Sequence, residues 1–164
     1  MKQVFFILLL FTATLTQAQD STKYDASCSR FIKSYPVLWQ QTAAEYRALC
    51  YQAFNMARLR VDEIPKRKLR REKLAIITDL DETIIDNSYS EAQLMKEGKE
   101  YNNASWKSWT DMSAATAVPG AVEFLQHAKQ KGIAIFYISN RDTSDVASTV
   151  INLQKHQAVE AFAG

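Results

Sequence analysis

The stretch from Leu74 to Asn87 constrains the fold of this chain more than any other. It begins with an apolar run, Leu74 to Ile77, whose length and composition predict a buried strand. Two carboxylates, Asp79 and Asp81, follow directly, and Thr83 comes two residues later. Open α/β sheets bind ligands at the carboxyl ends of their strands. The pattern therefore predicts an α/β fold with these side chains at a ligand site.

The second half of the chain predicts a neighbouring strand. Pro119-Gly120 precedes a helix expected from Ala121 to Lys131, and an apolar strand follows from Ile133 to Ile138. That strand ends in Ser139-Asn140-Arg141, and a further helix follows it. The order strand, crossover with helix, strand, helix predicts a parallel sheet with right-handed connections, which is a Rossmann-like core.

Residues 88–117 are too many for a plain connection between a strand and a helix. The segment is polar and aromatic, so we predict a helical cap inserted over the site. Trp106 and Trp109 are three residues apart and would share one face of a helix. That face either belongs to the core or offers a surface on which a base can stack.

Residues 1–18 are predicted to be a secretory signal peptide. Lys2 supplies a positive start, Val4 to Phe11 is apolar, and Thr16 and Ala18 fit the small-residue positions of a cleavage site. The apolar run is short for a membrane span, and an uncleaved anchor is the alternative. No cysteine lies near the junction, so lipoprotein anchoring is not expected. We predict an exported protein, periplasmic or secreted, with residues 19–164 as its mature domain.

Composition and charge narrow the class of function. The 164 residues are 47% hydrophobic and 23% charged, which is typical of one globular domain, and the net charge of +2 gives no ground for binding nucleic acid. The basic segment Lys66 to Lys73 predicts a solvated linker, or else a patch for anionic substrates or peripheral membrane contact. Export permits a disulfide between Cys28 and Cys50, and their pairing stays open.

A helix is expected to start near Pro36, after a lead-in without clear periodicity at residues 19–34. Residues spaced by three or four form its apolar stripe: Trp39, Ala43, Tyr46, Cys50, Ala53 and Ala57. The stripe predicts packing against the core, and the alternative is that Trp39 or Tyr46 walls a substrate pocket.

The residues at the two strand ends suit phosphoryl transfer. Asp79, held directly after a strand, can attack phosphorus, while Asp81 can protonate the leaving alkoxide and later activate water. Thr83 can hold Asp81 or the loop through its hydroxyl group. Ser139 can donate to a phosphoryl oxygen with help from the Asn140 amide. The concentrated negative charge requires a cation, for which Mg²⁺ is the natural choice.

Taken together, these segments resemble the haloacid dehalogenase superfamily. The segments that carry the likeness are Asp79 to Thr83, Asp86-Asn87, Pro119 to Phe124 and Phe136 to Arg141. More narrowly, the chain resembles the bacterial class C acid phosphatases, the outer-membrane lipoprotein e family. The resemblance implies a Mg²⁺-dependent phosphomonoesterase acting on nucleoside 5′-monophosphates and similar small esters, hence an acid phosphatase or 5′-nucleotidase.

The resemblance also implies roles for single residues. Asp79 would be the nucleophile and a metal ligand. Asp81 would be the general acid and base, and its backbone carbonyl would bind the metal. Ser139 would bind phosphate.

The chain departs from the family pattern at its C-terminal end. A lysine that neutralises the phosphoryl group and a pair of aspartates that complete the magnesium site are expected beyond the second strand. Asp142 and Asp145 fall in a capping turn, and Lys155 lies late in a helix. We therefore expect a C-terminally incomplete fold whose 164 residues alone bind Mg²⁺ weakly and turn over poorly.

Two other functions remain compatible with the sequence. A non-catalytic exported binding protein could keep the fold and lack the second half of the site. A phosphotransferase could use the same aspartyl-phosphate and pass the phosphoryl group to an alcohol.

Overall fold

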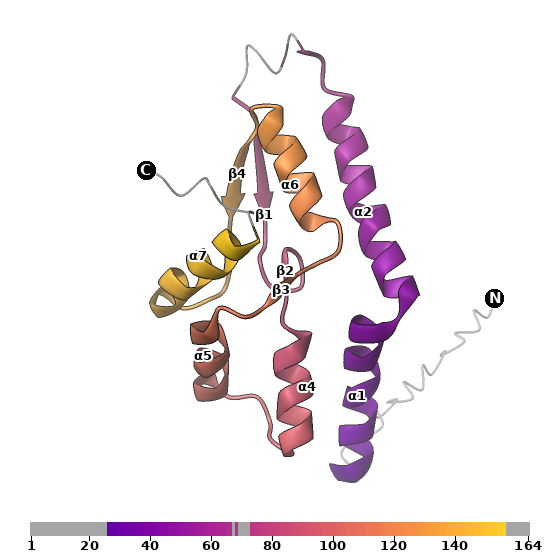
Figure 1. The fold of residues 1–164 in the computed structure, drawn as a ribbon, viewed down its shortest axis with the longest axis vertical. Helices are drawn as coiled ribbons and strands as arrows, with labels where there is room; N and C mark the ends of the chain where they lie inside the picture. The colour runs from indigo at the N-terminus through magenta and orange to yellow at the C-terminus, as the bar shows by residue number, and fades with distance from the viewer. Residues whose placement is uncertain (1–25, 67, 69–72, 157–164) are drawn as a thin grey trace, which may run out of the picture.

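The computed structural model describes residues 26–66, 68 and 73–156. The predicted signal peptide and most of the basic segment lie outside these residues. Two helices, α1 (Ala26–Thr42) and α2 (Ala44–Asp62), come first, and Figure 1 shows them along one side of the molecule. None of the described helices is long and apolar enough to cross a membrane.

The central sheet has two parallel strands, β1 (Ala75–Thr78) and β4 (Ala134–Tyr137), which are paired from Ala75↔Ala134 to Thr78↔Tyr137. The backbone N–H of Ile138 donates to Thr78 O at 2.9 Å, so the carboxyl ends of both strands lie together. Helix α6 (Ala121–Gln130) packs on β4 and on α2. This is the α/β arrangement with a parallel sheet that the order of elements predicts.

The segment predicted as a cap contains two helices, α4 (Ser88–Glu97) and α5 (Asn103–Met112). It is flanked by a short antiparallel pair, β2 (Ile85–Asp86) and β3 (Thr116–Ala117). Helix α4 packs against α1, and α5 packs against α7 (Val146–Lys155), which follows the short helix η2 (Thr143–Asp145). Figure 1 shows α4 and α5 beyond the ends of β1 and β4 where the strands point.

The core lies between the sheet, α6 and the β2–β3 pair. Its most buried apolar side chains are those exposed by 1% or less: Ile84, Ile85, Ala121, Leu125, Ala128 and Leu153. Ile84 and Ile85 come directly after the predicted site loop, so burial of these two residues anchors that loop.

Three predictions about the N-terminal half are wrong. Helix α1 begins at Ala26, within the expected lead-in, and carries Pro36 in its interior. The expected single helix is broken at Ala43, whose backbone is extended (φ −75°, ψ 129°). The partly buried stripe of α2 passes through the predicted Cys50, a free thiol, and Ala57, and also through Phe54, whereas the predicted Ala53 is exposed. The side chain of Cys28 lies outside the described residues.

Strand β1 has the predicted position but not the predicted burial. Its side chains alternate between exposed and partly covered, and Ile77 is 69% exposed. On β4, Phe136 is also exposed, at 57%. In the described part of the chain, the sheet is covered on one face, whereas a parallel strand buried on both faces was expected.

Candidate active site

Asp79 follows the last residue of β1, and its side chain points into solvent. The described residues offer no hydrogen bond to its carboxylate, although the Thr78 hydroxyl donates to its backbone carbonyl at 3.0 Å. A carboxylate that is fixed at its backbone and unpartnered at its oxygens is free to approach a ligand. This is the arrangement that a nucleophile requires.

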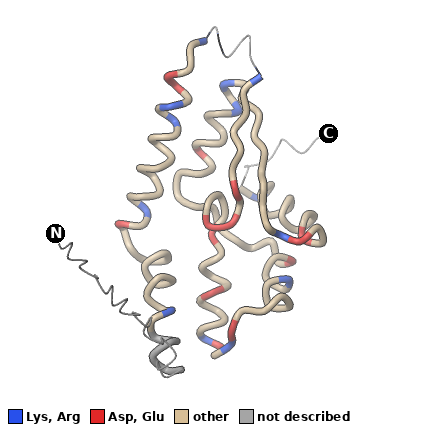
Figure 2. Tube along the Cα trace, turned by 180° about the vertical axis from the view of Figure 1, so that it is seen from behind, with Lys and Arg blue, Asp and Glu red and all other residues tan. Residues whose placement is uncertain are grey.

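A tight turn brings the chain back from Asp79 toward β2. The carbonyl of Leu80 accepts the backbone N–H groups of Thr83, Ile84 and Ile85 at 3.3, 2.8 and 3.0 Å. Glu82 has a positive φ of 55°, which is uncommon for a residue with a side chain, and its N–H donates to Ile85 O at 2.8 Å. Figure 2 shows the acidic positions that gather in this turn.

Arg141 holds the carboxylate of Asp81. Its Nη2 donates to Asp81 Oδ1 at 2.7 Å, and its Nε lies 3.2 Å from Oδ1 and 3.1 Å from Oδ2. The Arg141 side chain is 6% exposed and that of Asp81 is 23% exposed. Nη1 donates to Thr149 Oγ1 at 2.9 Å, and the guanidinium lies 5.3 Å from the centre of the Trp106 ring. Three separate contacts therefore orient this guanidinium.

Asn87 holds Asp81 from the other side. Its Nδ2 donates to Asp81 Oδ1 at 2.8 Å, and its Oδ1 accepts from Trp109 Nε1 at 2.8 Å. An indole N–H can only donate, so this bond fixes which way the buried amide points. Asp81 Oδ1 thus has most of the hydrogen bonds, and Oδ2 is the freer oxygen.

The carboxylate of Glu82 lies behind the same turn and accepts the backbone N–H of Asn87 at 3.0 Å. Burial of this carboxylate raises the pKa of Glu82 above its ordinary value, and the charges of Asp81 and Asp86 act in the same direction. The hydrogen bonds from Asn87 oppose that increase. Asp86 in turn accepts from Gln40 of α1 at 2.9 Å and from the Ser88 N–H at 2.8 Å.

Ser139 comes from the end of β4 and reaches the same place. Its Oγ lies 3.5 Å from Asp81 Oδ2 and accepts the backbone N–H of Arg141 at 3.1 Å. Asn140 is exposed and lines a cavity of about 340 Å³ together with Tyr101, Trp106 and other residues. The structure therefore brings Asp81 and Ser139 together at adjacent strand ends, with Asp79 two residues from Asp81 along the chain.

The Thr83 hydroxyl does not hold Asp81, which was one of the two roles predicted for it. Its backbone N–H donates to Leu80 O, and within the described part of the chain its hydroxyl makes no hydrogen bond to Asp81. Arg141 and Asn87 hold Asp81 instead. Both residues lie within the recognised sequence motifs, but no role was predicted for either. The strand register could have revealed Arg141, since it puts the residues after Ile138 beside those after Thr78.

Of the acidic residues near the C-terminal end of the described chain, Asp142 caps the turn before α7, as predicted, whereas the Asp145 side chain bonds to α5. Asp142 accepts the N–H of Ser144 at 2.8 Å, and this bond lowers the pKa of Asp142. Asp145 is 1% exposed and accepts from the Thr110 hydroxyl at 3.0 Å. Lys155 donates to the carbonyl of Ser113 at 2.8 Å. All three side chains are therefore engaged by other described residues, Asp142 within its own turn and Asp145 and Lys155 with the segment from Thr110 to Ser113.

Residues 8–163 match the sequence model of the HAD superfamily, subfamily IIIB (acid phosphatase). The chain belongs to this subfamily. Its fold is correspondingly similar to that of the class C acid phosphatase from Bacillus anthracis, with a TM-score of 0.71, 38% identity and coverage of 82% of this chain. A second structure of that protein, with tungstate bound, gives a TM-score of 0.68 and 37% identity over 80% of this chain. The chain spans 56% and 55% of the lengths of these two structures.

Phosphatases of this superfamily generally use a divalent metal ion, and the oxygen atoms available at this site are suitable ligands for one. The unpartnered Asp79 carboxylate and the backbone carbonyl of Asp81 are hard ligands, and Mg²⁺ often takes one or two carboxylates and fills its shell with water and phosphate oxygens. The Asp81 carboxylate is already bonded to Arg141 and Asn87. Among the described residues, no group of three or more His, Cys, Asp or Glu side chains is arranged to hold a metal.

Proposed function

We propose that this protein is a Mg²⁺-dependent phosphomonoesterase that works through an aspartyl-phosphate. The observation that carries the proposal is the contrast between the free carboxylate of Asp79 and the firmly held carboxylate of Asp81, two residues apart at one strand end. A nucleophile must reach the substrate, whereas a proton carrier must be aimed. Membership of the acid phosphatase subfamily supports the same reaction.

In the proposed first step, an Asp79 oxygen attacks phosphorus and the bond from phosphorus to the alcohol oxygen breaks. Asp81 gives a proton to that leaving oxygen, so the alcohol departs neutral. Oδ2 is the suitable oxygen because Oδ1 is occupied by Asn87 and by Nη2 of Arg141. The contact between Oδ2 and Arg141 Nε must then be exchanged for the leaving oxygen.

In the second step, Asp81 takes a proton from water, the water oxygen bonds to phosphorus, and the acyl-phosphate bond to Asp79 breaks. Ser139 donates its hydroxyl hydrogen to a phosphoryl oxygen throughout. A Mg²⁺ ion held by Asp79 and the Asp81 carbonyl would neutralise phosphoryl charge. The related Bacillus anthracis enzyme binds tungstate, a tetrahedral oxyanion, which supports a phosphate-shaped site here.

The substrates that we propose are small phosphomonoesters, including nucleoside 5′-monophosphates. We also propose that the protein is exported, periplasmic or secreted, with its signal peptide cleaved after Ala18. N-terminal sequencing of the mature protein should begin at Gln19. An intact Met1 on exported protein would contradict the cleavage.

Trapping the phosphoenzyme tests the mechanism directly. Full-length protein is mixed with a ³²P-labelled nucleoside monophosphate and Mg²⁺ and then quenched in acid. We expect label on the protein that neutral hydroxylamine removes, absent in Asp79→Asn and absent with EDTA. Steady phosphate release by Asp79→Asn would refute the proposal. Transfer of label to added glycerol in preference to water would assign the phosphotransferase reaction instead.

A further inference from the structure

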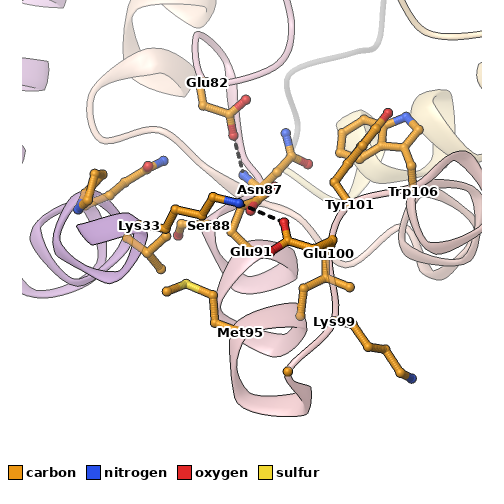
Figure 3. A pocket seen from close by; sticks show the side chains of 15 residues that line it. Lys33, Glu82, Asn87, Ser88, Glu91, Met95, Lys99, Glu100, Tyr101 and Trp106 are labelled. Carbon is orange, nitrogen blue, oxygen red and sulfur yellow. Dashed lines mark hydrogen bonds and ion pairs between the residues drawn. The ribbon is translucent and has the colours of Figure 1, made fainter. Parts of the chain in front are cut away.

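A cavity of about 430 Å³ lies between α1 and α4, beside the site (Figure 3). Pro36 and Val37 of α1 form one wall, and Leu94 and Met95 of α4 form the other. Trp106 closes one end. The volume is within the range of small-molecule sites, about 300–1,000 Å³, which typically have apolar walls and few polar groups.

One polar group in this cavity has no partner. Ser88, the first residue of α4, is 3% exposed, and its Oγ makes no hydrogen bond with any described residue. The other amides of the lining are already engaged, because Gln40 donates to Asp86 and Asn87 bonds to Asp81 and Trp109. An unpartnered buried hydroxyl is costly, so its presence in a cavity wall points to a ligand that supplies the missing bond.

The charges around the cavity favour an uncharged ligand. Lys33 of α1 pairs with Glu100 at 2.8 Å across the opening, as Figure 3 shows. Of the other charged lining residues, Glu82 and Glu91 are acidic and Lys99 is basic. The lining therefore has no excess of positive charge that would attract a second anionic group.

A single side chain, that of Asn87, separates the cavity from Asp81, the proposed proton carrier. Asn87 lines it and donates to Asp81 Oδ1 at 2.8 Å. Trp106 lines it as well and lies over the guanidinium of Arg141, which holds the same carboxylate. A molecule in the cavity can therefore contact Asn87, which bonds to Asp81, and Trp106, which contacts the Arg141 side chain that holds Asp81.

We propose that this cavity binds a compact uncharged organic molecule, with an apolar body between α1 and α4 and one polar group hydrogen-bonded to Ser88. Two sources have this chemistry. One is the organic part of a phosphomonoester substrate, and this assignment rests on the proposed function. The other is a separate effector that acts on Asp81 through Asn87. The binding test below requires no turnover, so it is independent of the proposed reaction.

Benzyl alcohol is the probe, and the methyl groups of ¹³C-labelled methionine report its position. Met95 lines the cavity, whereas Met56 is exposed on α2 and serves as an internal control. We expect the ring of the probe to shift the Met95 methyl signal, with saturation at about 1 mM or above for so small a ligand. An unchanged Met95 signal, or an equal shift at Met56, would overturn the proposal.

Two adjacent positions on α1 give a matched pair of variants. Val37 lines the cavity, whereas the neighbouring Leu38 does not line it and is 58% exposed to solvent. Val37→Trp should fill the cavity and abolish the Met95 shift, while Leu38→Trp should leave it unchanged. Persistence of the shift in Val37→Trp would overturn the location.

Ser88→Ala tests the polar contact. The variant should lose about fivefold in affinity for benzyl alcohol and none for toluene, which has no hydroxyl group. Folding should be intact, because the hydroxyl has no partner to lose. Equal losses for both probes would show that Ser88 has only a packing role and would contradict the predicted hydrogen bond.

Kinetics then separate the two sources. If the cavity holds the organic part of the substrate, Val37→Trp raises KM for benzyl phosphate but not for methyl phosphate, and benzyl alcohol inhibits competitively. If it holds an effector, Val37→Trp leaves both KM values unchanged and benzyl alcohol alters kcat. Competitive inhibition and a change in kcat would each support a ligand site in this cavity. A Met95 shift without any kinetic effect would contradict the proposed link between the cavity and Asp81.

Discussion

Asp79 and Asp81 leave the same strand end two residues apart, yet they lie in opposite surroundings. Asp79 is exposed, and its carboxylate has no hydrogen-bond donor in the described chain. Asp81 is bonded to Arg141 and Asn87, and these two partners are themselves fixed by Thr149, Trp106 and Trp109. The turn after β1 produces this difference, since it points one side chain outward and brings the next one back.

This contrast shows that one short motif can present an accessible carboxylate at Asp79 and a rigidly oriented one at Asp81. Freedom of the Asp79 carboxylate costs the fold little, because no other described side chain depends on it. The position of Asp81 is tied to four elements of the chain, so its loss must disturb the structure as well as the chemistry. Effects on activity and on stability should therefore separate between the two carboxylates.

The largest expected effect is on activity. Asp79→Asn should lower kcat of the full-length protein by about 10³-fold or more, equivalent to about 4 kcal/mol, because an amide cannot form the acyl-phosphate. The free energy of unfolding should stay within about 0.5 kcal/mol of the wild type, since the position is exposed. Urea unfolding followed by circular dichroism, beside steady-state kinetics, measures both. A large loss of stability would break the contrast.

The next effect is on stability. Arg141→Gln should lower the free energy of unfolding by about 3 kcal/mol, because it leaves the partly buried Asp81 carboxylate without its main partner. Arg141→Lys is the control: it keeps the charge, loses the two-nitrogen contact, and should lose less. Urea unfolding of the three proteins gives the comparison. Equal stability of wild type and Arg141→Gln would show that the pair does not hold this part of the fold.

The position of the site could be predicted from the sequence because its signals are local. The apolar runs before Asp79 and Ser139 mark β1 and β4, and Gly132, with a φ of 76°, marks the turn before β4. Parallel pairing then brings the two strand ends together. Apolar runs, turn glycines and strand-end polar groups were sufficient for this step.

The supports of the site could not be predicted in the same way, since they depend on contacts between distant residues. Arg141 and Asp81 are 60 positions apart, and Asn87 and Trp109 are 22 apart. The prediction that a helix starts near Pro36 and the prediction that Ile77 is buried in its strand are wrong for the same reason. Local propensity predicts an element, whereas packing of the whole molecule decides where it ends and which face is covered.

Ser139 offers a smaller test of how Asp81 is placed. Ser139→Ala removes the donor proposed for a phosphoryl oxygen and should lower kcat/KM about 30-fold, equivalent to about 2 kcal/mol. The contact with Asp81 Oδ2 is long, at 3.5 Å, so stability should change little. Ser139→Thr keeps the hydroxyl and should restore most of the activity. An unaltered kcat/KM in Ser139→Ala would exclude the residue from phosphate binding.

The smallest effect is expected at a third carboxylate, which is exposed like Asp79 but has partners like Asp81. Asp62 of α2 accepts from His127 of α6 and from Lys131 at the end of α6, each at 2.8 Å, and these hydrogen bonds, that of Lys131 first, lower the pKa of Asp62. A lowered folded-state pKa adds stability above the unfolded value of about 3.9, and this stability is lost as pH falls through the folded pKa. The Tm difference between wild type and Asp62→Asn should therefore be present at pH 7 and shrink below about pH 4. Adding Lys131→Met to both proteins should reduce the pH 7 difference, and an equal difference with and without Lys131 would assign it to something other than this ion pair.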